Sequence, residues 1–136
     1  MDIVINYWAV LVSALASMAI GMLWYGPVFG KQWMAMTGIT KESMKSMALS
    51  PTKAMSLGLV SSLIMAYVLG YVASALGTEG VPEALVLAFW IWLGFVATSQ
   101  ISGFLWEGKP LKLFLLNTAY SLVVYGVMAL ILVLWR

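Results

Sequence analysis

The sequence predicts an all-α membrane protein with four transmembrane helices in an antiparallel up-down bundle. Of the 136 residues, 63% are hydrophobic and only 9% are charged, and the mean hydropathy is +1.00. A soluble domain carries about 25% charged residues. Four apolar runs, each long enough to cross a hydrocarbon core of about 30 Å, are separated by segments rich in glycine, proline and lysine. We therefore expect residues 1–136 to form a single integral membrane domain.

The first apolar run covers residues 3–29. As a helix it spans roughly 40 Å at 1.5 Å per residue, which leaves length for tilt. A cleaved signal peptide is the competing interpretation, but the run is preceded by Met1 and Asp2 without a basic residue, and it is longer than an apolar signal region. We expect a retained first span.

Three further spans are expected at residues 51–76, 82–106 and 110–135. Each begins with proline, which is tolerated in the first turn of a helix. Short glycine-containing turns precede the third and fourth spans, so neighbouring helices are expected to be antiparallel.

Residues 30–50 form the one sizeable loop. Residues 31–37, followed by Gly38, are typical of a short helix with a glycine stop. Residues 40–48 are typical of a second helix capped by Thr40. Both helices are expected to lie in the lipid headgroup region, and binding to a partner protein is the alternative.

The basic residues predict the orientation. Six lysines lie in or beside the first and third connections, whereas the opposite side carries Arg136 alone. By the positive-inside rule, these connections are cytoplasmic and both termini are outside. The tryptophans are expected at the membrane interfaces, Trp24, Trp33 and Trp106 at the cytoplasmic side and Trp8, Trp90, Trp92 and Trp135 at the outer side.

The most restrictive stretch is residues 21–33, where glycines, a proline and aromatic residues close the first span. Its simplest role is to end this span and direct the chain into the surface helices. The alternative is a kinked lip around a binding site. The motif residues expected at the cytoplasmic end are Trp24, Gly26, Pro27, Gly30, Trp33, Trp106 and Glu107.

An offset of 82 residues aligns the first span with the third. Gly21, Leu23, Trp24 and Gly26 then fall on Gly103, Leu105, Trp106 and Gly108. This pattern indicates two parallel hairpin repeats. Chance coincidence of glycine and tryptophan at helix ends is the alternative, because the second and fourth spans match poorly.

The chain lacks the residues of common catalytic and metal sites. It contains no histidine and no cysteine, and no expected span interior contains an ionisable Asp, Glu, Lys or Arg. Proton-coupled transporters normally need an ionisable group at depth, and nucleophilic catalysis needs a nucleophile beside a base. We therefore expect neither an enzyme nor a metal or cofactor site.

Polar residues within the spans provide the candidate site. Gln100 and Asn117 are the costliest to bury without partners, and both lie within two turns of the expected cytoplasmic ends of adjacent spans. The candidate polar pocket consists of Tyr25, Ser99, Gln100, Asn117 and Tyr120. Hydrogen bonding between helices is the alternative role of these side chains.

Small residues recur every four positions in the second span, at Gly58, Ser62, Ala66, Gly70 and Ser74. Such a stripe lets helix backbones approach closely in a membrane. We expect it to pack helices, and it is the candidate surface for self-association.

The chain resembles the domain-of-unknown-function family numbered 1761. The resemblance rests on the aromatic and glycine residues of positions 24–33, the Gly38 loop, the Glu107–Lys109 turn and Asn117, and it covers nearly the full length. It implies a small four-span protein of the prokaryotic cytoplasmic membrane, and no established activity.

Two functions are expected from these observations. The first is a non-catalytic, oligomeric membrane component that binds lipid or another membrane protein. The alternative is a small uncoupled channel or facilitator for an uncharged or weakly polar solute, which needs no ionisable relay. The expected partners are membrane lipids and further copies of the chain, with a second membrane protein as the alternative, and nucleic acid is not among them.

Overall fold

The computed structural model describes residues 2–46 and 49–136. The described residues form helices joined by turns, without a strand. Four helical segments are long and apolar enough to cross a membrane, and they cover Tyr7–Val28, Pro51–Ala75, Gly80–Trp106 and Leu111–Leu134. The predicted all-α class with four candidate spans is therefore confirmed.

The first span consists of α1 (Tyr7–Leu23) and a π-helical turn, η1 (Trp24–Val28). Asn6 caps α1, because its side-chain oxygen accepts hydrogen bonds from the first amides of the helix. Pro27 has no amide hydrogen and disfavours α geometry at the preceding residue, and Gly26 accordingly leaves the helical region at φ −108° and ψ −105°. The apolar run therefore bends near its C-terminal end.

Helix α2 (Gly30–Thr37) follows this bend directly. A Cβ atom on Gly30 would lie 2.8 Å from the Tyr25 carbonyl oxygen, so only glycine fits there without a shift. The helix stops at Gly38, whose φ of 73° is left-handed. Both glycines thus have structural roles in directing the chain out of the first span.

Helix α3 (Lys41–Lys45) is shorter than the predicted helix at 40–48. Thr40 caps it as expected, in a reciprocal pair of hydrogen bonds with Ser43. Residues 47 and 48 lie outside the described residues.

The second span is a single helix, α4 (Pro51–Ala75), capped by the Ser50 hydroxyl. The third is divided into α5 (Gly80–Ile91), a π-helical turn η2 (Trp92–Ala97), α6 (Thr98–Gln100) and α7 (Ser102–Trp106). The fourth is again continuous, α8 (Leu111–Leu134). The residue composition of the third span does not predict these changes of helix type.

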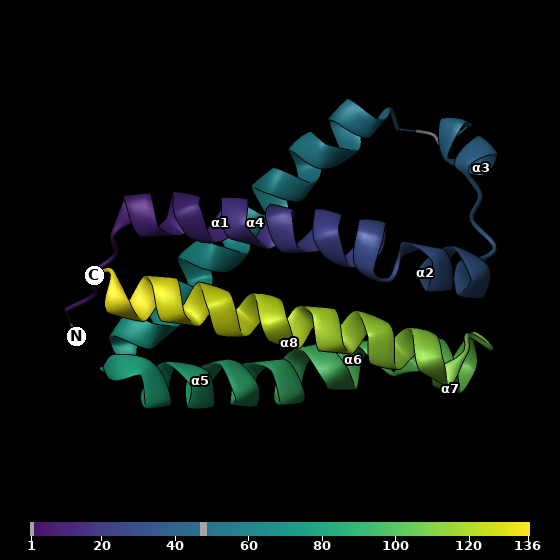
Figure 1. The fold of residues 1–136 in the computed structure, drawn as a ribbon. Coiled ribbons are helices and arrows are strands. Elements are labelled where there is room, and N and C mark those ends of the chain that lie inside the picture. The colour runs from purple at the N-terminus through teal and green to yellow at the C-terminus, as the bar shows by residue number, and fades with distance from the viewer. Residues whose placement is uncertain (1, 47–48) are drawn as a thin grey trace.

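Helix α8 lies at the centre of the packing, with α1 and α5 beside it, and α4 crosses α1 and α8 at an angle (Figure 1). The core is built largely from small residues, with the fully buried Met128 as its largest side chain. Small side chains allow the helices to approach closely. A short connection joins α4 to α5. The two helices diverge from it, because α4 packs mainly on α1 and α8.

The small-residue stripe of α4 lies against helices of the same chain. The position of Gly58 faces Met18, and Ser62 Oγ lies 3.4 Å from Ser17 Oγ, within hydrogen-bond distance. A Cβ on Gly70 would lie 3.3 Å from Leu132 Cδ2. The stripe therefore packs α4 onto α1 and α8, and this face is not open to a second copy of the chain.

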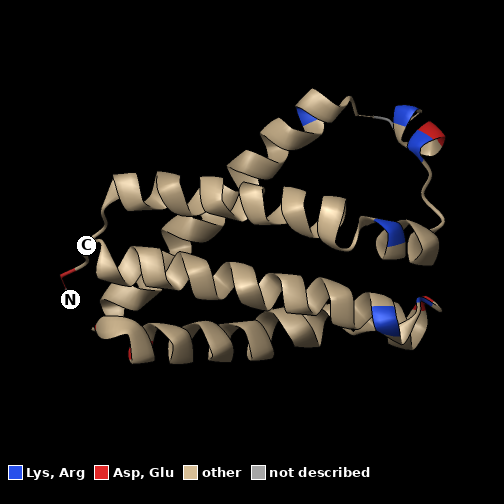
Figure 2. Cartoon of the chain, viewed as in Figure 1, with Lys and Arg blue, Asp and Glu red and all other residues tan. Residues whose placement is uncertain are grey.

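The two ends of the molecule differ in charge. Both termini lie at one end, and α2 and α3 lie toward the other (Figure 1). The lysines gather on α2 and α3 and near the starts of α4 and α8 (Figure 2). At the opposite end, the Arg136 guanidinium donates to the Thr78 carbonyl, and Asn6 Nδ2 donates to the Trp135 carbonyl at 3.2 Å.

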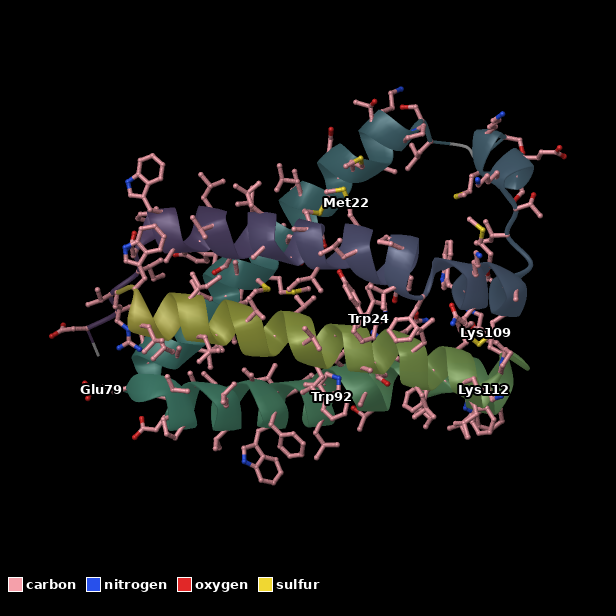
Figure 3. All side chains as sticks on the ribbon, viewed as in Figure 1. Met22, Trp24, Glu79, Trp92, Lys109 and Lys112 are labelled. Atoms are coloured by element: carbon pink, nitrogen blue, oxygen red, sulfur yellow. The ribbon has the colours of Figure 1, made fainter. Side chains whose placement is uncertain are left out.

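The expected interfacial position of Trp92 is wrong. The third span begins at Gly80, so Trp92 falls near its middle, and its indole Nε1 donates a 2.7 Å hydrogen bond to the Thr118 carbonyl of α8 (Figure 3). Buried indoles usually find such a partner.

The expected hairpin repeat is not supported by the surroundings of its two equivalent tryptophans, which differ. Trp24, which packs against Phe29 and Tyr120, would be equivalent to Trp106, which is 86% exposed. The π-helical turns also fall at non-equivalent positions of the first and third spans. The repeat therefore stays a prediction.

Candidate functional site

A cavity of about 430 Å³ lies near the lysine-rich end, between η1, the last part of the third span and α8. Four of the five residues of the candidate polar pocket line it, namely Tyr25, Gln100, Asn117 and Tyr120. Glu107 and Lys109 lie at its outer side. The tertiary structure thus brings together side chains from three spans.

Tyr25 and Asn117 form the closest polar contact in this cavity. The Tyr25 hydroxyl donates a 2.6 Å hydrogen bond to Asn117 Oδ1. The edge-to-face packing of Tyr25 against Tyr120 and Trp33, with ring centroids 5.1 and 5.6 Å apart, fixes the orientation of the ring. Because Oδ1 accepts this bond, the Asn117 amide nitrogen keeps its two donor hydrogens for another group.

The local sequence explains how each polar residue reaches the cavity. The π-helical turn at Gly26 and Pro27 holds the Tyr25 ring beside Trp33 of α2. On α8, Asn117 and Tyr120 are three residues apart and therefore share a face. The position of Gly21 gives room for Tyr120, since a Cβ there would lie 3.1 Å from its hydroxyl.

Gln100 and Ser99 have different roles. Within η2 and α6, the Thr98 and Ser99 hydroxyls donate to the carbonyls of Gly94 and Phe95, each at 2.7 Å. Ser99 therefore bonds its own helix and does not line the cavity. Gln100 lines the cavity and is an exposed residue. Its amide is available to a ligand as both donor and acceptor.

The charged residues at the outer side of the cavity neutralise each other. Lys109 Nζ lies 3.2 Å from Glu107 Oε2, and both side chains are more than half exposed. An exposed ion pair of this kind contributes about 0–1 kcal/mol to stability. Its effect here is to leave the mouth of the cavity without a net charge.

A second polar cavity, of about 320 Å³, lies deeper between α1, α4 and α8. Gln100, Tyr120 and Ser121 line both cavities. The deeper one adds the hydroxyls of Ser17 and Ser62. The predicted pocket did not include these serines, and Ser62 was expected only in the packing stripe, because a serine four residues from a glycine on an apolar helix is equally typical of helix packing.

The remaining motif residues lie around the site and not in it. Trp24 lines a separate apolar groove beside α8, with Phe29 and Lys112. Trp33 supports the Tyr25 ring, while Gly26, Pro27 and Gly30 shape the bend. Trp106 extends outward at the end of α7. Lys109 and Lys112 lie at this same end of the molecule (Figure 3).

The chemistry of the site is that of hydrogen bonding by uncharged groups. Phenol, amide and hydroxyl groups line the two cavities, and the ionisable pair lies only at the mouth. Cavities of about 300–1,000 Å³ with a few convergent polar groups are typical of small-molecule sites. Such a lining is suited to an uncharged polar group.

The comparisons with known proteins agree with this structure and add no activity. No curated protein and no solved structure matches the chain. A family described as "Protein of unknown function (DUF1761)" matches residues 8–133, which include all four candidate spans but for their outermost residues. The resemblance seen in the sequence is thereby confirmed, and the chain belongs to the DUF1761 family.

Proposed function

We propose that this protein is a non-catalytic component of a prokaryotic cytoplasmic membrane that binds an uncharged, weakly polar molecule. The observation that carries the proposal is the hydrogen bond from Tyr25 to Asn117, which closes one wall of a cavity lined by donors and acceptors from three spans. An asparagine placed at membrane depth is costly without partners. Here its amide nitrogen remains directed to a site with space for a ligand.

The proposed arrangement in the bilayer is an antiparallel bundle with both termini outside. The chain leaves the end that holds the termini along α1 and α5 and returns along α4 and α8 (Figure 1). The lysine-rich end (Figure 2) then faces the cytoplasm by the positive-inside rule. In this orientation the mouth beside Glu107 and Lys109 opens to the cytoplasmic interface.

We also propose that copies of the chain associate with one another. Because the α4 stripe is covered by α1 and α8, a contact between copies has to use another face. The proposal of a non-catalytic role is supported by the lack of histidine and cysteine in the chain, and by the pairing of the Glu107 carboxylate in the larger cavity with Lys109 at 3.2 Å.

Native mass spectrometry of the protein, released from its membrane in a mild detergent, tests both proposals. We expect a multimer that retains one small molecule per chain. Asn117→Leu, which removes the amide from the cavity, should abolish this retained mass. Val123→Leu, an exposed position on the same helix, is the matched control and should keep it.

Two outcomes would contradict the proposal. If wild-type protein retains no additional mass, either in detergent or after reconstitution into lipid, it does not bind a small molecule. Equal retention by Asn117→Leu and Val123→Leu would place the molecule elsewhere. A monomeric mass would contradict self-association alone.

A facilitator of an uncharged solute is the second candidate function. It is supported by the shared lining of the two polar cavities, where Gln100, Tyr120 and Ser121 join the mouth to the middle of the bundle. Uptake of small polyols into proteoliposomes tests it. Flux above that of protein-free vesicles, abolished by Asn117→Leu, would favour the facilitator over a binding component.

A further inference from the structure

An apolar groove of about 560 Å³ lies where α4 and the third span diverge. Its α4 side is formed by residues such as Ile64, Met65 and Val68, and its opposite side by Phe95 and Val96 of η2. Several of these side chains are half exposed or more. In a bilayer this groove opens sideways to the lipid chains, since α4 packs mainly on α1 and α8 and leaves α5 (Figure 1).

The groove lies beside the deeper polar cavity. It shares Ser61, Met65, Val96 and Tyr125 with the deeper polar cavity. That cavity in turn shares Gln100 with the cavity beside Tyr25 and Asn117. In the order of these shared residues, the lining of the three neighbouring spaces changes from apolar in the groove to hydrogen-bonding beside Asn117.

The lining also defines which polar group fits. The deeper cavity offers amides and hydroxyls without a charged side chain, and in the cavity beside Asn117 the Lys109 ammonium is already paired with the Glu107 carboxylate. Burying a phosphate there without a counter-charge would be strongly unfavourable. An alcohol or ester group is satisfied by these donors and acceptors. The apolar groove thus suits the hydrocarbon chain of an uncharged amphiphile, and the polar cavities suit its head group.

We propose that the molecule bound by this protein is an uncharged amphiphile of the monoacylglycerol kind. Its chain lies in the groove between α4 and η2, and its hydroxylated head lies among Gln100, Tyr120 and Asn117. It enters sideways from the bilayer. This inference rests on the function proposed above, because it names the class of ligand for the same site.

The test uses monooleoylglycerol that carries a photoactivatable group at the end of its chain, with the full-length protein in lipid nanodiscs. We expect crosslinks within residues 61–72 of α4 and 91–96 of the third span. Val68→Trp fills the groove and should lower the crosslink yield about tenfold, because the chain then loses its buried apolar surface. Val60→Trp is the matched control, since Val60 and Val68 are on the same helix and are 52% and 53% exposed.

Displacement distinguishes this site from ordinary lipid contact. Excess unlabelled monooleoylglycerol should remove the crosslinks, and excess phosphatidylglycerol should not. Crosslinks spread over all lipid-facing residues, or displaced equally by both lipids, would overturn the inference. The wild-type crosslink map decides the question even when Val68→Trp fails to fold.

The proposed function and this inference can fail separately. If Asn117→Leu abolishes the retained mass while wild-type protein gives no crosslinks in the groove, the polar site stands and its ligand is not this amphiphile. If neither Asn117→Leu nor Val68→Trp changes binding of the probe, both proposals are wrong.

Discussion

The Tyr25 hydroxyl donates a 2.6 Å hydrogen bond to Asn117 Oδ1 and so connects the bend of the first span to the fourth span. These residues are 92 positions apart in the chain. The bond joins two segments that otherwise meet through aromatic packing, and it makes Tyr25 part of both the fold and the candidate site.

Tyr25→Phe should destabilise the protein by about 1 kcal/mol, the usual contribution of one hydrogen bond between membrane helices or within a protein. The substitution keeps the ring and removes only the hydroxyl. Unfolding by a denaturing detergent, followed by circular dichroism, measures the change. Tyr71→Phe, at a half-exposed position of α4, is the control and should have little effect. Equal effects of the two substitutions would contradict the structural role of the hydrogen bond.

Gly70→Leu should lower stability by about 1–3 kcal/mol, because an added side chain overpacks the contact between α4 and α8. A Cβ at this position would already lie 3.3 Å from Leu132 Cδ2. Gly94→Leu is the control, because its Cβ would meet no heavy atom within 4 Å. The same unfolding measurement applies. If Gly70→Leu instead leaves stability intact and reduces the assembled mass, the stripe serves contacts between copies.

Trp92→Phe should cost about 1 kcal/mol, since the Thr118 carbonyl loses its 2.7 Å hydrogen bond from the indole. Trp90→Phe, at a neighbouring position that is 62% exposed, should be nearly neutral. Thermal unfolding monitored by circular dichroism compares the pair. A larger loss for Trp90→Phe would mean that the exposed tryptophan contributes more to stability than the interhelical hydrogen bond of Trp92.

The proposed orientation predicts which single cysteines are labelled from outside. The chain contains no cysteine, so each introduced one is unique. In intact cells, a membrane-impermeant maleimide should label Asp2→Cys and not Lys41→Cys. Lysed cells provide the control, because both variants should then react. Labelling of Lys41→Cys in intact cells would reverse the proposed topology.

Local signals in the sequence were sufficient for most element boundaries. Pro51 begins α4 as predicted, and Gly38 ends α2 in a left-handed conformation, because caps and stops depend on residues a few positions apart. The same reasoning placed Tyr25, Gln100, Asn117 and Tyr120 near one end of their spans. Their gathering around a cavity is observed in the structure, and their binding of a ligand stays a prediction.

The sequence by itself determined the membrane composition, the four candidate spans and the family of this protein. Only the tertiary structure decided which faces meet. Ser99 bonds its own helix and Trp92 turns toward α8, because the π-helical turn η2 interrupts the regular spacing on which face predictions depend. Apolar side chains surround every span, so hydropathy does not distinguish a lipid-facing surface from a helix contact. The position of the α4 stripe against α1 and α8 therefore depends on close packing across the whole chain.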